Sequence, residues 1–473
     1  MTALDSNANT DFKKLKAICV PLLGTSRLTP ASIQPTLNLL TELNRILSEI
    51  PSENLTSNLI SYVFLPLSTI LQRNPSSEIP NQILEKIFIA LSFLCESWWW
   101  TCDVKVWEQI FMLSGAVIGG IDEKSGRKRD DETKDAAARC LISLLRPRSA
   151  EEASNRNLDP VLVEDRLTAL QKDAQNPKFV PVVGQTLDSV LNAAFSFHLS
   201  LQRAVLEVTY LLIDLYLPDR LVPSVLPGVV STMTKICLGQ PQEKGWANGE
   251  IVARGLQVMQ VVVTRAIGNE VCIRDGAIRR IDTLEDLVGS QSQAEPSTAD
   301  KQLPYGTVRT ESWLRGTATQ LHIAINSISS LQSHPTPFAL QSLADFSATL
   351  LRSTSLTLPQ TQSLLLSFLL SLSLSEYRSV SSEARQSLKH LLLNPSDAQL
   401  SLQYTVMKNL GDNLSALQKY FNFKNLSFSH SQLKIVLYLD ISRAFWQFLC
   451  DFWPTSDSKI DNLETQLDKF VPL

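Results

Sequence analysis

Residues 201–239 read LQRAVLEVTYLLIDLYLPDRLVPSVLPGVVSTMTKICLG, and this stretch predicts a helical hairpin. Apolar side chains recur at helical spacing up to Tyr216, which indicates one amphipathic helix. The dipeptide Pro218-Asp219 is typical of a turn, and a second apolar helix then returns. Pro223 and Pro227 fall in the first half of that second helix.

The same layout recurs at residues 336–392, with a helix, a turn at Thr357 to Pro359, a second helix and a third opening after Val380. Two antiparallel helices in about 40 residues is the size class of HEAT and armadillo repeats. A lone hairpin cannot bury its apolar face, whereas stacked hairpins share a continuous core. The sequence therefore predicts an all-α fold, a HEAT/armadillo-like α-solenoid of stacked antiparallel helix pairs, with essentially no strand.

Two polar stretches divide the predicted array. Residues 122–135, DEKSGRKRDDETKD, hold almost no apolar side chain, and residues 290–304, SQSQAEPSTADKQLP, are rich in Ser, Gln and Pro. Both compositions are typical of loops. We therefore expect an N-terminal helical-repeat segment over 1–289 with a charged loop at 122–135, a flexible linker over 290–309, and a C-terminal helical-repeat segment over 310–473.

The bulk composition excludes several classes of protein. The 473 residues carry 43 Lys+Arg and 47 Asp+Glu, a formal net charge of −4, which gives no reason to expect direct binding to nucleic acid. Hydrophobic residues make up 44%, enough to fill a core and to exclude disorder for most of the chain. The most apolar run, Leu364 to Leu374, is shorter than the roughly 20 residues that span a bilayer, so we expect a buried helix and no membrane partner.

The cysteines and the N-terminus bear on the cellular compartment. The seven cysteines are Cys19, Cys95, Cys102, Cys140, Cys237, Cys272 and Cys450. An odd and scattered set argues against a disulfide framework and predicts buried thiols in a reducing compartment. The first residues, MTALDSNANTDFKKLK, lack the apolar core of a secretory signal. We expect a cytoplasmic protein, with the nucleus left open as a second location.

The sequence contains no recognisable catalytic or metal-binding constellation. The five histidines are His198, His322, His334, His390 and His430, and none lies within four residues of another. Neither the H-E-x-x-H metal motif nor the phosphate-binding glycine motifs nor G-x-S-x-G is present. GAVIGG at 115–120 is interpreted as a helix end rather than a phosphate loop. We therefore expect no catalytic residue, no metal and no cofactor.

A small basic cluster lies in the charged loop and consists of Lys124, Arg127, Lys128 and Arg129. A nuclear import signal or a phosphate contact is one interpretation. Acidic residues flank the cluster on both sides, so a solvated loop is the favoured interpretation.

Trp98, Trp99 and Trp100 stand side by side at the end of a predicted helix. Successive helical side chains point about 100° apart, so all three cannot face one core. At least one should be exposed or should face a neighbouring element. Trp99 and Trp100 are therefore candidate partner contacts, because Trp is enriched at interface hot spots. Packing at a helix corner is the favoured alternative.

Several stretches, taken in their order along the chain, form a recognisable set. They are SYVFLPLSTILQR at 61–73, a Leu/Ile-rich helix ending at Trp98, VWEQIFMLSGAVIGG at 106–120, TKDAAARCLISLL at 133–145, VLPGVVSTMTKICLGQPQEKGWANGEIVARGLQVMQVVV at 225–263, TESWLRGTATQLHIAINSI at 310–328 and VSSEARQSLKHLL at 380–392. This set resembles the TELO-two-interacting protein one family, and its fungal members in particular. The residues that match the family pattern are interpreted as architectural: Pro66, Trp107, Gly119, Gly120, Trp246 and Trp313.

The resemblance implies a non-catalytic scaffold. That family supplies the long HEAT-repeat subunit of the Triple T cochaperone complex, which works with Hsp90 to mature phosphatidylinositol-3-kinase-related kinases. The implied partners are the other Triple T subunits, kinases of that class and Hsp90 adaptors, and the family carries no catalytic residues. The alternative is another helical-repeat adaptor, such as a karyopherin-like transport factor, for which an array of about 20 repeats would be normal.

Overall fold

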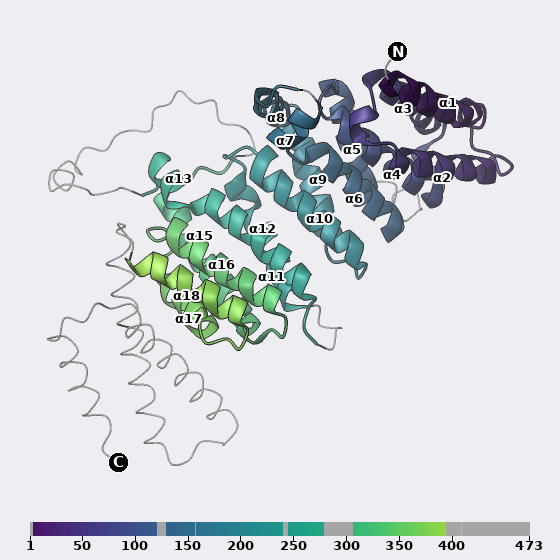
Figure 1. Cartoon of the computed structure of the whole chain (residues 1–473). Coiled ribbons are helices and arrows are strands. Elements are labelled where there is room, and N and C mark those ends of the chain that lie inside the picture. Colours follow the sequence, from purple (N-terminus) through teal and green to yellow (C-terminus); the bar gives the residue numbers. More distant parts are fainter. Residues whose placement is uncertain are drawn as a thin grey trace, which may run out of the picture. The chain divides into compact units, whose positions relative to one another are not determined.

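The structure is a computed structural model, and it describes residues 3–120, 129–156, 158–239, 245–278, 306–393 and 408. Throughout these residues every regular element is a helix and no strand is formed (Figure 1). The predicted all-α fold is therefore confirmed. Apolar positions repeat at the helical period, and each helix buries one stripe against its neighbours.

Most of the helices are joined by short connections. Up to residue 238 they are α1 (Ala3–Gly24), α2 (Ile33–Glu49), α3 (Ser57–Arg73), α4 (Asn81–Trp98), α5 (Val104–Gly119), α6 (Asp131–Leu145), α7 (Ala150–Asn155), α8 (Val161–Ala174), α9 (Val180–Ala193), α10 (Leu199–Leu211) with a π-helical turn (Leu212–Tyr216), and α11 (Val222–Leu238). The later ones are α12 (Gly249–Ile267), α13 (Asn269–Arg274), α15 (Glu311–Ser327), α16 (Pro337–Ser353), α17 (Pro359–Leu372) and α18 (Arg378–Leu393).

Contacts divide the described residues into two compact units. The first holds the residues up to Ile236, together with Gln257–Ala266 and residues 306–308. The second holds Cys237–Leu256 and the remaining described residues, so the two halves of α12 belong to different units. The linker expected over 290–309 lies mostly outside the described residues, and that boundary stays a prediction.

The first unit is a row of helix pairs. The pairs are α1 with α2, α3 with α4, α5 with α6, and α9 with α10. The first helix of one pair contacts the first helix of another, as α1 contacts α3 and α5 contacts α9. Second helices contact second helices in the continuous series α2, α4, α6 and α10. This regular stacking is the α-solenoid that the sequence predicts, because each pair covers the apolar face of the next.

The helices of the second unit stack in a similar way. α15 contacts α17, and α16 contacts both α17 and α18, so alternate helices lie against each other as they do in the first unit. α17 contains most of the apolar run Leu364 to Leu374, and its side chains are largely buried, as expected. The segment Gly249–Arg274 is long and apolar enough to cross a membrane, but 67% of its apolar window is buried inside the protein, as in a core helix.

Helix starts are set by local side chains that accept hydrogen bonds from free backbone N–H groups. Thr56 accepts from the N–H of Leu59 at the start of α3, and Asp130 accepts from the N–H of Thr133 at 3.0 Å. The Asp130 cap starts α6 inside the charged segment, so the loop expected over 122–135 ends before Asp131. Residues 121–128 of that loop lie outside the described residues.

Candidate functional site: the tryptophan turn and its arginines

The chain reverses between α4 and α5 through residues 98–102, which we name the tryptophan turn. The Trp99 N–H donates to the carbonyl of Cys95 at 3.0 Å, and the Cys102 N–H donates to the carbonyl of Trp98 at 2.7 Å. Asp103 then begins α5 by accepting a hydrogen bond from the N–H of Lys105. The turn is thus fixed by its own backbone and holds three indole rings in a small volume.

The three tryptophan side chains lie in different environments. The Trp98 ring stands edge-on to Phe64 with ring centroids 4.9 Å apart. Trp99 is only 1% exposed, and its ring meets that of Trp100 edge-on at 5.1 Å. Trp100 is half-buried. The expectation that Trp99 serves as a partner contact is therefore wrong, because its side chain is enclosed by the protein, whereas the expectation for Trp100 stays a prediction.

Arginine side chains cover this turn. The guanidinium of Arg148 lies over the Trp99 ring at 5.8 Å, and that of Arg156 lies over the Trp100 ring at 5.7 Å. Both distances allow cation–π attraction. Arg166 donates from Nε to the carbonyl of Trp99 at 3.0 Å and from Nη2 to the carbonyl of Cys102. The arginines thus contact both the rings and the backbone of the turn.

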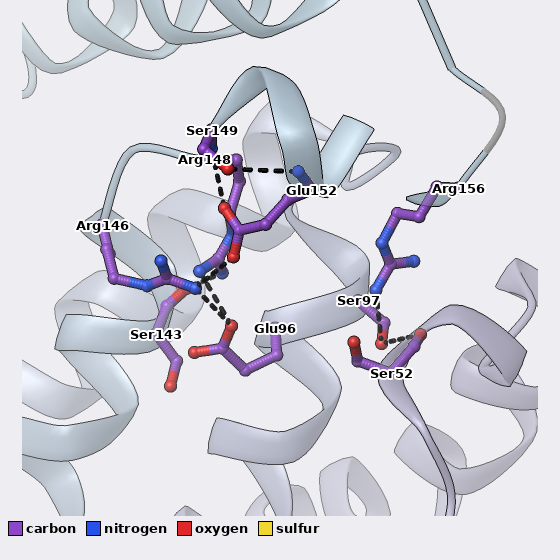
Figure 2. Close-up of polar contacts among 9 residues, drawn as sticks. All are labelled: Ser52, Glu96, Ser97, Ser143, Arg146, Arg148, Ser149, Glu152 and Arg156. Carbon is purple, nitrogen blue, oxygen red and sulfur yellow. Dashed lines mark hydrogen bonds and ion pairs between the residues drawn. The ribbon is translucent and has the colours of Figure 1, made fainter. Parts of the chain in front are cut away.

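A network of ion pairs joins α4 to the connection between α6 and α7 (Figure 2). Glu96 forms ion pairs with Arg148 at 2.8 Å and with Arg146 at 3.2 Å. Arg146 also pairs with Glu152 at 2.8 Å, and Arg148 donates to the carbonyl of Ser143 at 2.7 Å. Two carboxylates and two guanidinium groups therefore alternate in one chain of ion pairs, from Arg148 through Glu96 and Arg146 to Glu152.

Hydroxyl groups complete the arrangement. Ser149 and Glu152 form a capping box that starts α7, with each side chain accepting from the other's backbone N–H. Ser97 donates to the carbonyl of Ser52 at 2.6 Å, and Arg156 approaches the Ser97 hydroxyl at 3.4 Å (Figure 2). Through Ser97, these contacts tie the end of α7 to α4 and to the segment before α3.

Burial changes the acid–base properties of the network. It lowers the pKa of Arg148, an effect that Glu96 opposes by favouring the charged guanidinium. Burial alone would raise the pKa of Glu152, but the Ser149 N–H and the Arg146 side chain hold that pKa below its ordinary value. The Glu152 carboxylate therefore stays ionised at neutral pH, and its pair with Arg146 helps to hold the helices in place.

The helices held by these arginines lie outside the regular stack. Because α5 contacts α9 and α6 contacts α10, the pair α7 and α8 is an insertion between two repeats. α7 and α8 pack mainly against each other, and α8 also contacts the π-helical turn. Their fully buried side chains are few: Ala153, Leu170 and Ala174. Charged and hydrogen-bonded anchors thus position this insertion where apolar packing is sparse.

A second aromatic cluster surrounds Trp107, the family-pattern residue in α5. Its ring lies 5.3 Å from Phe111, 5.7 Å from Phe179 and 6.0 Å from Tyr216. The Tyr216 hydroxyl donates to the carbonyl of Leu145 at 2.8 Å. The cluster is fully buried, so Trp107 lies in the core where two repeats meet.

Glycines at the end of α5 allow close packing as well as the helix stop. Gly120 has φ of 63° and caps α5 in the left-handed conformation, which favours glycine. A Cβ on Gly115 would overlap Thr186, and one on Gly119 would overlap Ser189, both on α9. GAVIGG is therefore a helix end, as predicted, and Gly115 and Gly119 also let α5 approach α9.

The remaining family-pattern residues lie elsewhere. Pro66 is buried inside α3, which continues through it. Trp246 is 46% exposed and lies edge-on to His334 at 5.2 Å, in the second unit. Trp313 is half-buried in the first turn of α15, where Thr310 caps its N–H. No contact joins these residues to the tryptophan turn among those described.

The basic cluster is split by the structure. Arg129 is buried and donates to the carbonyls of Ile79 and Ser76 and to the Asn81 side chain, at 2.6 to 2.9 Å. It is therefore a structural residue, not a solvated one, which corrects the interpretation for this position. Lys124, Arg127 and Lys128 lie outside the described residues.

Two of the histidines make structural contacts, and the cysteines that the structure describes are buried. His198 caps α10 by accepting from the N–H of Leu201, and His334 contacts the carbonyl of Ala247 at 3.0 Å. Six free cysteines are buried, as predicted, and burial raises the pKa of Cys237 to about 12. Among the described residues no group of three or more His, Cys, Asp or Glu is placed to hold a metal ion.

Sequence reasoning identified the tryptophans but missed the arginines around them. Arg148, Arg156 and Arg166 lie roughly 50 to 70 residues from their partners in the sequence, so no local spacing marks them. The one local signal is Arg-Pro-Arg-Ser at 146–149, where proline ends α6 and serine caps α7.

Fold and site together define a helical-repeat protein of the α-solenoid class. Paired helices stack in register, and the most elaborate polar cluster holds helices rather than a reacting group.

The chain belongs to the TTI1 family, because the sequence model of the TTI1 N-terminal TPR domain matches residues 12–376. This confirms the family to which the sequence motifs point. No curated protein matches the chain.

Two solved structures show a distant likeness to the chain. Yeast importin-β (Kap95p) has 12% identity and a TM-score of 0.26, over 93% of this chain and 60% of that one. Kap121p bound to Pho4p has 12% identity and a TM-score of 0.21, over 95% of this chain and 48% of that one. The chain thus spans less than two thirds of either, and TM-scores this low carry no argument about function.

Proposed function

We propose that this protein is a non-catalytic scaffold of a Triple T-type cochaperone complex. In that role it holds the other Triple T subunits, kinases of the phosphatidylinositol-3-kinase-related class and Hsp90 adaptors together while the kinases mature. The single observation that carries the proposal is the family match over residues 12–376.

The fold is suited to such a role. A row of stacked helix pairs offers long ridges of helices and turns on which large partners can be held. The insertion of α7 and α8, which Arg166 anchors to the tryptophan turn, interrupts this row and presents extra surface. The titratable groups of the site are committed to ion pairs and backbone carbonyls, so they support positioning and not chemistry.

The test is recovery of partners by the tagged full chain from cell extract, identified by mass spectrometry. We expect the other two Triple T subunits or a kinase of the stated class. A second helical-repeat protein with the same tag and at the same concentration is the control, since it shares the architecture but not the family. Recovery of neither partner class would count against the proposal.

The karyopherin-like alternative is separated by one added measurement. A transport factor should bind a GTP-loaded small GTPase of the Ran class, whereas the proposed scaffold should not. The same preparation of tagged chain serves both assays, so a folding defect would abolish both signals.

The location of the protein is part of the proposal. We place it in the cytoplasm, where the buried thiols that the structure describes would stay reduced. Fractionation of cells that express the tagged chain tests this location and also measures any nuclear share.

A further inference from the structure

Helix α1 is the first helix of the first unit and packs against α2 and α3. The side chains on its inward stripe are buried, and they are Leu15, Ile18, Cys19 and Leu22. The opposite side of the helix is exposed, and it includes Lys13, Lys16, Ala17 and Val20. One face of α1 is therefore packed into the array and the other is open.

Helix α3 lies beside α1 and extends this open surface (Figure 1). The Phe12 ring meets the Tyr62 ring at 5.3 Å, and near the other ends of the two helices Arg73 donates to the Ser26 hydroxyl at 2.9 Å. The two helices therefore run side by side in the same direction. Leu65 lies one turn after Tyr62 on α3, so it belongs to the same surface.

Three large apolar side chains of this surface face solvent. Val20 is 53% exposed, Leu65 is 52% exposed and Phe12 is 37% exposed. Single exposed apolar residues are ordinary, but three of them on two adjacent helices offer anchor points for another apolar element.

The charged residues of this part of the chain are of one sign. No Asp or Glu occurs in residues 12–41 or in residues 54–77. The two stretches contain α1 from Phe12 onward, the turn that follows it and the whole of α3. The charged residues that they do contain in α1, in this turn and in α3 are all basic: Lys13, Lys14, Lys16, Arg27 and Arg73. A surface with this pattern attracts acidic groups and repels basic ones.

Two lysines carry the charge of the open face. Lys13 and Lys16 are exposed, and neither forms an ion pair with another residue that the structure describes. Lys14, by contrast, pairs with Asp11 at 3.7 Å. The next acidic residue along the chain, Glu42, is also in an ion pair. The two exposed lysines are thus available to carboxylates from outside the chain.

We propose that the α1/α3 surface, defined by Phe12, Lys13, Lys16, Val20 and Leu65, docks an acidic amphipathic helix of another protein. The apolar side chains of that helix would cover the three exposed apolar residues, and its Asp or Glu side chains would pair with the two lysines. Amphipathic helices bind through apolar anchors at helical spacing, and complementary charge supplies specificity and speed of association. The inference concerns a new surface and does not depend on which complex the protein joins.

The test uses the whole chain and a fluorescent peptide of Leu and Glu, designed as an amphipathic helix. A peptide with the same Leu positions but Lys in place of Glu is the charge control. By anisotropy we expect the Leu/Glu peptide to bind about tenfold or more tightly than the Leu/Lys peptide, and to weaken as salt is raised. The net charge of −4 would by itself favour the Leu/Lys peptide, so this preference would report the local surface. Equal binding of the two peptides, or no binding of the Leu/Glu peptide, would overturn the proposal.

Paired substitutions locate the binding. Lys13→Gln with Lys16→Gln removes the two charges, and Val20→Ser with Leu65→Ser removes two of the apolar anchors. Each pair should weaken binding of the Leu/Glu peptide by about fivefold or more. All four side chains are exposed, so circular dichroism should report an intact fold.

Each pair has a matched control. Lys105→Gln with Lys178→Gln removes two exposed lysines elsewhere in the first unit and changes the net charge by the same amount. Ile323→Ser with Leu356→Ser removes two exposed aliphatic side chains from the second unit. Both controls should leave binding of the Leu/Glu peptide unchanged.

Two further outcomes would overturn the proposal. If the Leu/Glu peptide binds both α1/α3 variants as tightly as the unaltered chain, the contact lies elsewhere. Vesicles of phosphatidylserine in phosphatidylcholine are the second probe, because exposed lysines beside apolar side chains also suit an anionic membrane surface. If the chain sediments with these vesicles and does not bind the Leu/Glu peptide, the ligand is a lipid surface and not a helix. Neither result bears on the cochaperone proposal, which is tested by partner recovery.

Discussion

Two tryptophan sites of the first unit are built on opposite physical principles. Trp107 is surrounded by aromatic rings from α5, the segment before α9 and the π-helical turn, and the cluster is fully buried. Trp99 is equally buried, yet an arginine lies over its ring and another arginine bonds its backbone. One site joins repeats by apolar contact, whereas the other attaches an insertion by charge and hydrogen bonds.

The difference follows from what each site has to bury. Stacked repeats offer two matching apolar faces, so burial and close approach at glycines supply their stability. A short insertion has few apolar side chains, and it is located instead by directional bonds to carbonyls and carboxylates. Such bonds contribute modest net free energy but fix geometry well. We therefore expect global stability to depend on the first site and local order to depend on the second.

A substitution in the aromatic cluster should destabilise the protein most. Trp107→Ala removes a large side chain from the core and should lower the free energy of unfolding of the first unit by about 3–5 kcal/mol. Denaturant titration followed by circular dichroism measures this change. Trp246→Ala is the matched control, because that indole is 46% exposed and should cost far less. Equal losses in the two variants would contradict the assignment of Trp107 to the core.

The next effect is at the buried guanidinium of the ion-pair network. Arg148→Met leaves the Glu96 carboxylate without its closest partner and should lower the free energy of unfolding by about 2 kcal/mol. This is less than the loss expected for a fully buried pair, because Glu96 is one-third exposed. Adding Glu96→Gln should recover part of that loss. A double-mutant cycle measures the coupling, and strictly additive losses would show that the pair is energetically unimportant.

A smaller and more local effect is expected at α8. Arg166→Leu removes both hydrogen bonds to the tryptophan turn. It should lower the free energy of local opening of α7 and α8 by about 1 kcal/mol and leave the stability of the rest of the first unit unchanged. Hydrogen exchange should quicken in α8 and not in α5. Arg315→Leu, at a highly exposed ion pair, is the control and should alter neither helix. Faster exchange throughout the first unit would mean that Arg166 supports the repeats themselves.

These two sites also show how far the sequence predicts the structure. Helices and their pairing follow from apolar periodicity and turn residues, as in residues 201–239, because both signals are local. Gly120 was predictable as a helix end for the same reason. The arginine contacts were not predictable, since Arg148 and Arg166 meet groups some 50 to 70 residues away, many of them backbone carbonyls. The burial of Trp99 depends on those same distant contacts.

The smallest effect is a pH dependence at Glu152. Its pKa in the folded protein lies below the ordinary value of 4.5, so its ion pair and capping bond stabilise the fold above that value and lose their contribution as the pH falls through the folded pKa. Glu152→Gln should therefore lower the free energy of unfolding by about 0.5 kcal/mol at pH 7, a small change because the side chain is one-third exposed. Below about pH 5 the stability of this variant should fall less steeply with pH than that of the unaltered chain. Melting temperatures from pH 3 to pH 8 measure both.

Glu151→Gln, at the exposed neighbour in the same turn of α7, should leave the pH profile as steep as in the unaltered chain. If the two variants flatten it equally, the effect belongs to the general charge of α7, and the pairing of Glu152 with Arg146 contributes nothing specific.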